Sequence, residues 1–203
     1  MINGSNEVSE KTILKAFESG FSNAAISFSQ LVNSKVSFDN FHTGYIDFKL
    51  SSTNLHERYQ HYNGFPRYLL TTEVFGDIGG KSYLFFSQQD FEVLTKAVPD
   101  MVQGTLNLRE EFIKELDNIL SAAVITKLSN DLNHKMFGDV PLLVGKVSAR
   151  LEDVIYDDFG EQNDQVYINS ISFSFENLPH VNPLFVWVFD TKLLNDVQTK
   201  AVE

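Results

Sequence analysis

The sequence predicts an α+β fold made of two copies of one unit, on the basis of three observations. A segment at 13–39 is followed a hundred residues later by a similar segment at 112–139. Each copy continues into strand-like apolar runs joined by short turns, and hairpin-connected strands favour antiparallel pairing. The chain of 203 residues contains no Ser/Gly-rich or Pro-rich linker between the copies. We therefore expect one pseudo-twofold domain over 1–203, with an antiparallel sheet and flanking helices.

The repeat is weak in identity and regular in spacing. "ILKAFESGFSNAAISFSQLVNSKVSFD" (13–39) aligns with "FIKELDNILSAAVITKLSNDLNHKMFGD" (112–139), and the apolar pattern is kept. At an offset of 100 the identical pairs include Ser29/Ser129, Asn33/Asn133, Lys35/Lys135 and Asp39/Asp139. The first repeat is predicted to cover 10–100 and the second 106–203.

After its helix, the first half is predicted to form strands, a hairpin and a closing helix. The apolar runs "YIDFKL" (45–50), "RYLLTTEVFG" (67–76) and "KSYLFFS" (81–87) predict strands, with "DIGG" as the turn between the last two. "QDFEVLTKAV" (89–98) is typical of a helix, with Ser87 as its N-cap. The stretch 51–65 is compatible with a loop or a short helix.

The second half follows the same order. The predicted elements are a helix over 108–130, a strand over 142–153, a half-buried strand over 165–176 with strict alternation, and a strand over 183–190 after the turn "NLPHVN". A last helix from 191 would be capped by Asp190 or Thr191.

Composition excludes several classes of function. The chain has no cysteine, which removes disulfides, thiol nucleophiles and Cys-based zinc sites. A formal net charge of −11 disfavours both nucleic acid and an acidic membrane leaflet as partners. The N-terminus has no signal-peptide pattern and no stretch reaches the length of a membrane span, so we expect a cytoplasmic protein.

Motifs for common cofactors are missing. No GxxxxGK[ST], GxGxxG or GxSxG occurs, and "GDIGG" (76–80) sits between strands, as a hairpin turn does. The five histidines have no spacing typical of metal ligands, so we expect no metal site and no cofactor bound by this chain. Ser-His-Asp catalysis stays open on sequence alone.

The predicted helix at 108–130 has two distinct faces. Its buried stripe is expected to comprise Leu108, Phe112, Leu116, Ile119, Ala123 and Leu128. Glu111, Glu115, Asn118 and Ala122 line up on the other side. A solvated face is one interpretation, in which Glu111, Glu115 and Asp117 keep the helix soluble and Asn118 is incidental. In the other interpretation, Glu115 and Asn118, three residues apart on one face, act together on a partner.

The stretch "ELDNILSAAVITKLSNDL" (115–132) resembles the (D/S)xxxExxN helix of the CheC/CheX/FliY family of response-regulator phosphatases. "GDVPLLVGKVSARLEDVI" (138–155) and "FSNAAISFSQLVNSKV" (21–36) resemble segments of CheC, the branch that is itself a tandem repeat. The similarity extends over nearly the whole chain, and CheC is the closest match. The expected fold is therefore a single CheC-like domain.

The resemblance implies hydrolysis of the aspartyl phosphate of a CheY-like response regulator. Glu115 would engage the lysine of the receiver domain and Asn118 would position the attacking water, while Mg²⁺ stays on the receiver. Glu111 would make a secondary contact, where the family has Asp or Ser. The small residues Ser121 and Ala122 would let the partner approach closely.

The first half departs from the motif, because Lys11, Lys15 and Glu18 occupy the aligned positions. Lys15 would repel the receiver's lysine and Glu18 would oppose a phosphate, so this degenerate first site is predicted to be inactive. Two alternatives stay open: a non-catalytic adaptor that binds a receiver or a CheD-like deamidase, and a subunit of a structural homodimer.

Overall fold

An antiparallel sheet with helices on both faces forms the body of the protein. The structure is a computed structural model that describes residues 4–48, 59, 67–97, 105–161 and 163–191. Its elements are α1 (Gly4–Val32), β1 (Val36–Asp47), β2 (Arg67–Gly76), β3 (Gly80–Ser87), α3 (Gln88–Ala97), α4 (Leu106–Leu132), β4 (Met136–Gly138), β5 (Leu142–Val147), α5 (Leu151–Phe159), β6 (Gln165–Phe175) and β7 (Leu184–Asp190).

The order of the strands reflects the predicted repeat. The sheet runs β1-β6-β7-β3-β2-β4, and β5 continues the edge beyond β4 by pairing with β2. Every pairing is antiparallel, and β3 pairs with β7 at the centre, where the halves meet. Each half thus supplies a central strand, its hairpin partner and an edge, which confirms the α+β class and the pseudo-twofold arrangement.

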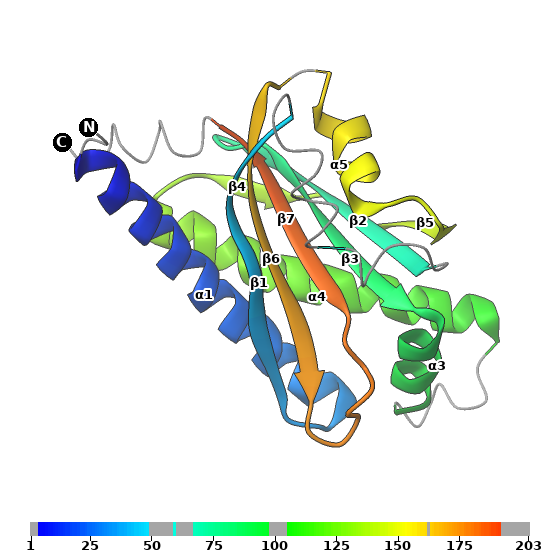
Figure 1. Ribbon diagram of the computed structural model, residues 1–203. Coiled ribbons are helices and arrows are strands. Elements are labelled where there is room, and N and C mark those ends of the chain that lie inside the picture. Colours follow the sequence, from blue (N-terminus) through cyan, green and yellow to red (C-terminus); the bar gives the residue numbers. More distant parts are fainter. Residues whose placement is uncertain (1–3, 49–58, 60–66, 98–104, 162, 192–203) are drawn as a thin grey trace.

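The helices cover the two faces of the sheet unequally. The long helices α1 and α4 lie on one face and cross each other there, while α5 covers part of the opposite face (Figure 1). The crossing is close, because a Cβ added to Gly20 would lie 3.1 Å from Cα of Val124. Two buried clusters result, a larger one between the sheet and the long helices and a smaller one under α5. None of the described helices combines the length and apolarity needed to cross a bilayer.

The two long helices end in the same way. Asn33 and Asn133 both adopt the left-handed conformation, with φ of 48° and 53°. Ser29 Oγ donates to the carbonyl of Ser34 at 2.7 Å, and Ser129 Oγ donates to that of His134 at 2.6 Å. Asparagine tolerates this conformation better than most residues, so the identical pairs in the repeat correspond to shared helix ends.

Several local predictions are confirmed. Strands β2 and β3 and helix α3 match their predicted ranges within two residues. Ser87 caps α3 by accepting from the amide of Asp90 at 3.0 Å, and Asp90 Oδ2 accepts from the amide of Ser87 at 2.8 Å. The glycine-rich turn joins β2 to β3 as expected.

Other local predictions are wrong. The first strand begins at Val36, not at 45, and the single strand expected over 142–153 is β5 followed by helix α5. Leu151 and Ile155 of that helix are both buried, and their spacing of four residues places them on one helical face. Strand β6 is buried on both faces rather than on one, because α5 and the long helices cover opposite sides. The stretch 51–65, apart from the buried Tyr59, and the helix expected from 191 lie outside the described residues.

Candidate functional site

The exposed face of α4 is as predicted. The helix begins at an N-cap, Thr105, whose hydroxyl accepts from the amide of Leu108 at 3.3 Å. From there Glu111, Glu115, Asn118 and Ala122 are all exposed. The residues that were expected to face a partner therefore do face solvent, with the exception of Ser121, which is 2% exposed.

The buried stripe of α4 differs from the prediction. Leu108 is 44% exposed, and Phe112, Ile119 and Ala123 are only half-buried. The fully buried apolar residues are Ile113, Leu116, Leu120, Val124, Ile125, Leu128 and Leu132. The helix is rotated because it packs on the sheet and on α1 together, so two neighbouring rows of side chains are covered.

Glu115 and Asn118 have no side-chain partner among the described residues, in either hydrogen bonds or ion pairs. Glu111, in contrast, forms an ion pair with Lys114. Residues three apart on a helix have Cβ atoms roughly 5–6 Å apart, so the carboxylate and the amide can address one ligand together. The pair is open and uncommitted, while Glu111 is already engaged.

A pocket of about 260 Å³ opens beside Asn118. Helix α4 supplies one wall, and strands β2 and β4 supply the other. The residues most relevant to its chemistry are Thr72, Asn118, Ser121, Ala122, Gly138 and Asp139. An amide, two hydroxyls and an exposed carboxylate thus surround a space large enough for a few water molecules or a phosphoryl group.

Comparison with the first half explains why this space is empty of side chains. At the offset of 100, Ser121 corresponds to Phe21 and Gly138 corresponds to Phe38. The rings of Phe21 and Phe38 pack with centroids 5.8 Å apart. Where two rings fill the first half, a serine and a glycine leave a pocket in the second. A Cβ at Gly138 would lie 2.8 Å from Cδ1 of Ile125, so that wall has no room for a larger residue without movement.

Two residues of this site, Asp117 and Thr72, were not predicted from the sequence. Asp117 was interpreted as a solubilising residue, but it is 0% exposed. Its position four residues after the buried Ile113 and four before Ser121 was the available signal. Thr72 had no such signal, because its place under α4 depends on how β2 lies beneath the helix.

The degenerate first site occupies the equivalent surface of α1. Lys11, Lys15 and Glu18 are exposed, as are their counterparts at 111, 115 and 118. At the first two of these positions α1 carries a lysine where α4 carries a glutamate, so the charge is opposite.

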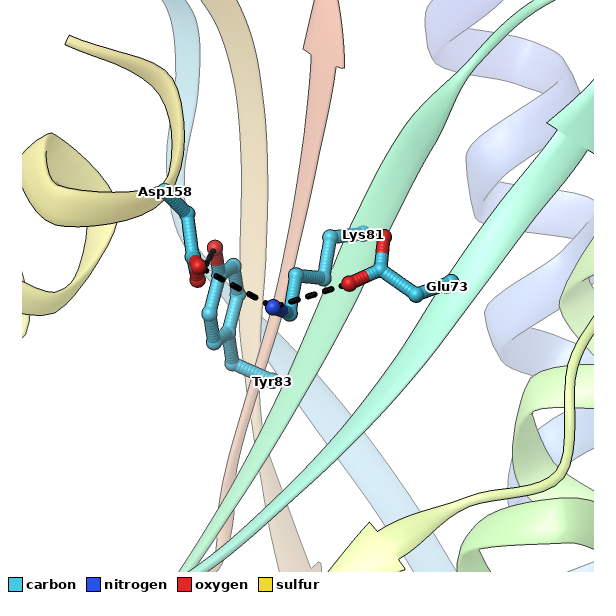
Figure 2. Close-up of polar contacts among 4 residues, drawn as sticks. All are labelled: Glu73, Lys81, Tyr83 and Asp158. Carbon is cyan, nitrogen blue, oxygen red and sulfur yellow. Dashed lines mark hydrogen bonds and ion pairs between the residues drawn. The ribbon is translucent and has the colours of Figure 1, made fainter. Parts of the chain in front are cut away.

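A second polar cluster lies on the other face of the sheet (Figure 2). Lys81 Nζ lies 2.9 Å from Glu73 Oε1 and 3.1 Å from Asp158 Oδ1, and the Tyr83 hydroxyl donates to Asp158 Oδ2 at 2.7 Å. A pocket of about 460 Å³ adjoins these groups.

The charges of this second cluster satisfy one another. Burial disfavours the charged form of Lys81, but its hydrogen bonds to Glu73 and Asp158 outweigh burial and raise the pKa of Lys81. Burial, and next the hydrogen bond to Asp158, raise the pKa of Tyr83. Because Asp158 belongs to α5, these contacts hold that helix against β3. A structural role therefore accounts for the cluster.

No family model and no curated protein matches the sequence. Among solved structures, FliY from Thermotoga maritima is 14% identical with a TM-score of 0.68, and the match covers 98% of this chain and 97% of that one. This chain has the fold of FliY. A chemotaxis protein CheX from Desulfovibrio desulfuricans (12% identity, TM-score 0.56, 88% and 99% covered) shares it too.

The FliY-like fold is not confined to CheX and FliY. The middle domain of FliM from H. pylori is 10% identical with a TM-score of 0.59, over 95% of this chain and 97% of that one. At these identities the likeness concerns the fold. The resemblance found in the sequence is thereby confirmed at the level of the fold, while the closer relation to CheC stays a prediction.

Proposed function

We propose that this chain is a phosphatase of the CheC/CheX/FliY type, which hydrolyses the aspartyl phosphate of a CheY-like receiver domain. The observation that carries the proposal is the free pair on α4: Glu115 and Asn118 are exposed, lack side-chain partners among the described residues, and lie at the ExxN spacing beside a pocket. A solvated face alone gives no reason for a neighbouring pocket.

The chemistry assigned to the pair requires little of this chain. Glu115 would form an ion pair with the receiver's lysine and so orient the two proteins. The Asn118 amide, which both donates and accepts hydrogen bonds and carries no charge, would hold a water in line with the phosphorus–oxygen bond. The water oxygen bonds to phosphorus, the bond to the aspartyl oxygen breaks, and inorganic phosphate leaves. Mg²⁺ on the receiver would neutralise the developing charge.

Exposed apolar side chains follow the edge of the sheet that adjoins the pocket. We define the apolar rim as Phe75, Phe137, Val140, Leu142 and Val144, which are 50–82% exposed. Phe75 and Phe137 are cross-strand partners, and Phe137 also lines the pocket next to Asn118. Exposed apolar patches of this kind are typical of interaction sites.

The first half has no counterpart of this rim. The equivalents of its β4–β5 members are Ser37, Asn40, His42 and Gly44. Only the second half thus combines an uncommitted carboxylate and amide, a pocket and an apolar surface. We therefore propose a single active site, with the receiver docked over α4 and the β4–β5 edge.

The test is phosphate release from a receiver charged with a small-molecule phosphodonor, with the receiver's own hydrolysis subtracted. Asn118→Ala is expected to lower the acceleration by about a hundredfold, as loss of one preorganised amide does in other enzymes. Asn130→Ala makes the same chemical change at an exposed position of the same helix, and is expected to leave the rate unchanged. Equal rates for wild type and Asn118→Ala would refute the role of Asn118.

A non-catalytic adaptor is the second candidate. FliM middle domains share this fold, and one FliM structure from H. pylori was solved as a complex with SpeE, so the fold also serves protein binding. A receiver or a CheD-like deamidase that binds without faster phosphate release would favour the adaptor. A homodimer stays a separate hypothesis, which the molecular mass in solution decides.

A further inference from the structure

A buried polar network lies directly beneath the exposed pair on α4. Asp117 is 0% exposed, and its Oδ2 accepts a hydrogen bond from the Thr72 hydroxyl at 2.7 Å. The Ser121 hydroxyl donates to the other oxygen, Oδ1, at 3.4 Å. Ser121 and Ser82 in turn share a hydrogen bond of 3.3 Å. The network therefore links α4 to β2 and β3.

The first half does not contain this network. The strand registers and the offset of 100 pair Thr72 with Ile171, Asp117 with Phe17, Ser121 with Phe21, and Ser82 with Phe185. All four counterparts are fully buried apolar residues. The fold accepts an apolar solution at these positions, so a buried carboxylate, which is costly to desolvate, is not required by the architecture.

The network reaches the pocket through its two hydroxyls. Thr72 and Ser121 line the same pocket as Asn118, and Asp117 immediately precedes Asn118 in the chain. An ionised Asp117 accepts only, so both hydroxyl protons point towards it. Ser82 then donates to Ser121, which leaves one lone pair on the Ser121 hydroxyl. That lone pair and those of the Thr72 hydroxyl can accept hydrogen bonds from a water in the pocket. A protonated Asp117 would donate to one hydroxyl and disturb this arrangement.

We propose that Asp117 is a positioning residue, an inference that rests on the proposed function. It acts through the Thr72 and Ser121 hydroxyls to orient the attacking water held by Asn118. The role is specific to the second half, because the four equivalent positions of the first half are apolar.

Asp117 can change its charge near neutral pH. Burial raises its pKa to about 7, although the hydrogen bonds from Thr72 and Ser121 oppose that shift. Charges on the neighbouring elements face elsewhere: Glu73 of β2 and Lys81 of β3 pair on the opposite face of the sheet. On α1, Lys15 and Glu18 are exposed.

The carboxylate that lines the pocket itself is that of Asp139, which accepts from the amide of Val140 at 2.7 Å. Asp139 is exposed, so Asp139→Asn provides a matched control for the removal of a charge from this pocket.

The experiment measures kcat and KM for the phosphorylated receiver between pH 6 and pH 8. For wild type, kcat is expected to fall about tenfold from pH 8 to pH 6 as Asp117 takes up a proton. Asp117→Asn should lower kcat at pH 8 by about tenfold, leave KM unchanged and remove the pH dependence. Asp139→Asn should keep the pH dependence.

Variants of Thr72 test the same idea if Asp117→Asn does not fold. Thr72→Val removes the hydroxyl with little change of shape and is expected to lower kcat severalfold, whereas Thr72→Ser keeps the hydroxyl and should restore it. Thr95→Val removes a buried hydroxyl outside the network, one that donates to the carbonyl of Phe91, and should leave kcat unchanged.

The outcomes separate this inference from the function on which it rests. If wild type accelerates hydrolysis and Asn118→Ala does not, but Asp117→Asn and Thr72→Val keep the wild-type kcat and pH profile, the positioning role is refuted alone. If wild type gives no acceleration of its receiver, the proposed function fails, and the role of Asp117 in that reaction fails with it.

Discussion

Helices α1 and α4 occupy equivalent places on the sheet, with buried and exposed positions that correspond almost residue for residue at an offset of 100. What they bury is different. Phe17 and Phe21 of α1 pack into an aromatic cluster, whereas Asp117 and Ser121 of α4 form hydrogen bonds to the strands below. The pattern of burial therefore sets the fold, while the chemistry at a few positions distinguishes a sealed half from one with a pocket.

Placing the buried second-half residue at the equivalent position of the first half should have the largest effect on stability. Phe17 is fully buried, with its ring centroid 5.9 Å from that of Phe189 and 6.5 Å from that of Trp187. Phe17→Asp would remove these contacts and bury a carboxylate in a half where the equivalent of Thr72 is Ile171, which offers no side-chain donor. The free energy of unfolding should fall by about 4 kcal/mol or more. Urea denaturation measures it, with Phe17→Leu as an apolar control that should lose about 1.5 kcal/mol at most. A similar loss in both variants would show that α1 tolerates polarity as α4 does.

The next largest effect is expected in how the free energy of unfolding depends on pH, because α4 buries the carboxylate of Asp117 where α1 buries Phe17. Because the pKa of Asp117 is raised in the folded state, the native protein keeps a proton that the unfolded chain has released above a pH of about 4. Its contribution to stability is therefore present at low pH and is lost as pH rises through about 7. Asp117→Asn should remove this decline, which amounts to about 2 kcal/mol between pH 5 and pH 7. Parallel curves of unfolding free energy for wild type and variant would contradict the shifted pKa.

The exposed pair can be tested by a transfer of charge from one half to the other. Glu115→Lys gives α4 the residue that α1 carries at the equivalent position, Lys15. Repulsion of the receiver's lysine should weaken receiver binding by about tenfold, and less at high salt. Glu111→Lys makes the same change four residues earlier, where the native carboxylate already pairs with Lys114, and should have a smaller effect. Titration of the receiver measures both, and equal affinities for the two variants would argue against a specific role for Glu115.

The smallest effect is expected from a graft in the opposite direction. Lys15→Glu combined with Glu18→Asn recreates the ExxN pair on α1. In an Asn118→Ala background we expect less than about a threefold gain in phosphate release, because the rings of Phe21 and Phe38 still occupy the position of the pocket. Full recovery of the rate would show that the surface pair suffices and that the pocket and the buried network are unnecessary.

Much of the architecture could be predicted from the chain alone. Alternating and continuous apolar runs located β2, β3, β6 and β7, because strand periodicity and turn residues are local properties. Helix α5 was missed because its nine residues follow closely on an edge strand, and two buried apolar residues make a weak signal. Helical spacing placed Glu115 and Asn118 on one face, and the resemblance to the (D/S)xxxExxN helix singled them out as a pair.

The sequence by itself determined the duplicated α+β plan and the exposure of Glu111, Glu115, Asn118 and Ala122 on α4, since both depend on repeats and periods of a few residues. Only the tertiary structure decided that Asp117 points inward, that Thr72 lies beneath it, and that Ser121 and Gly138 leave a pocket where Phe21 and Phe38 fill one. These facts depend on the rotation of a helix and on the register of strands far apart in the chain. Such long-range geometry is set by the packing of the whole core and has no local signature.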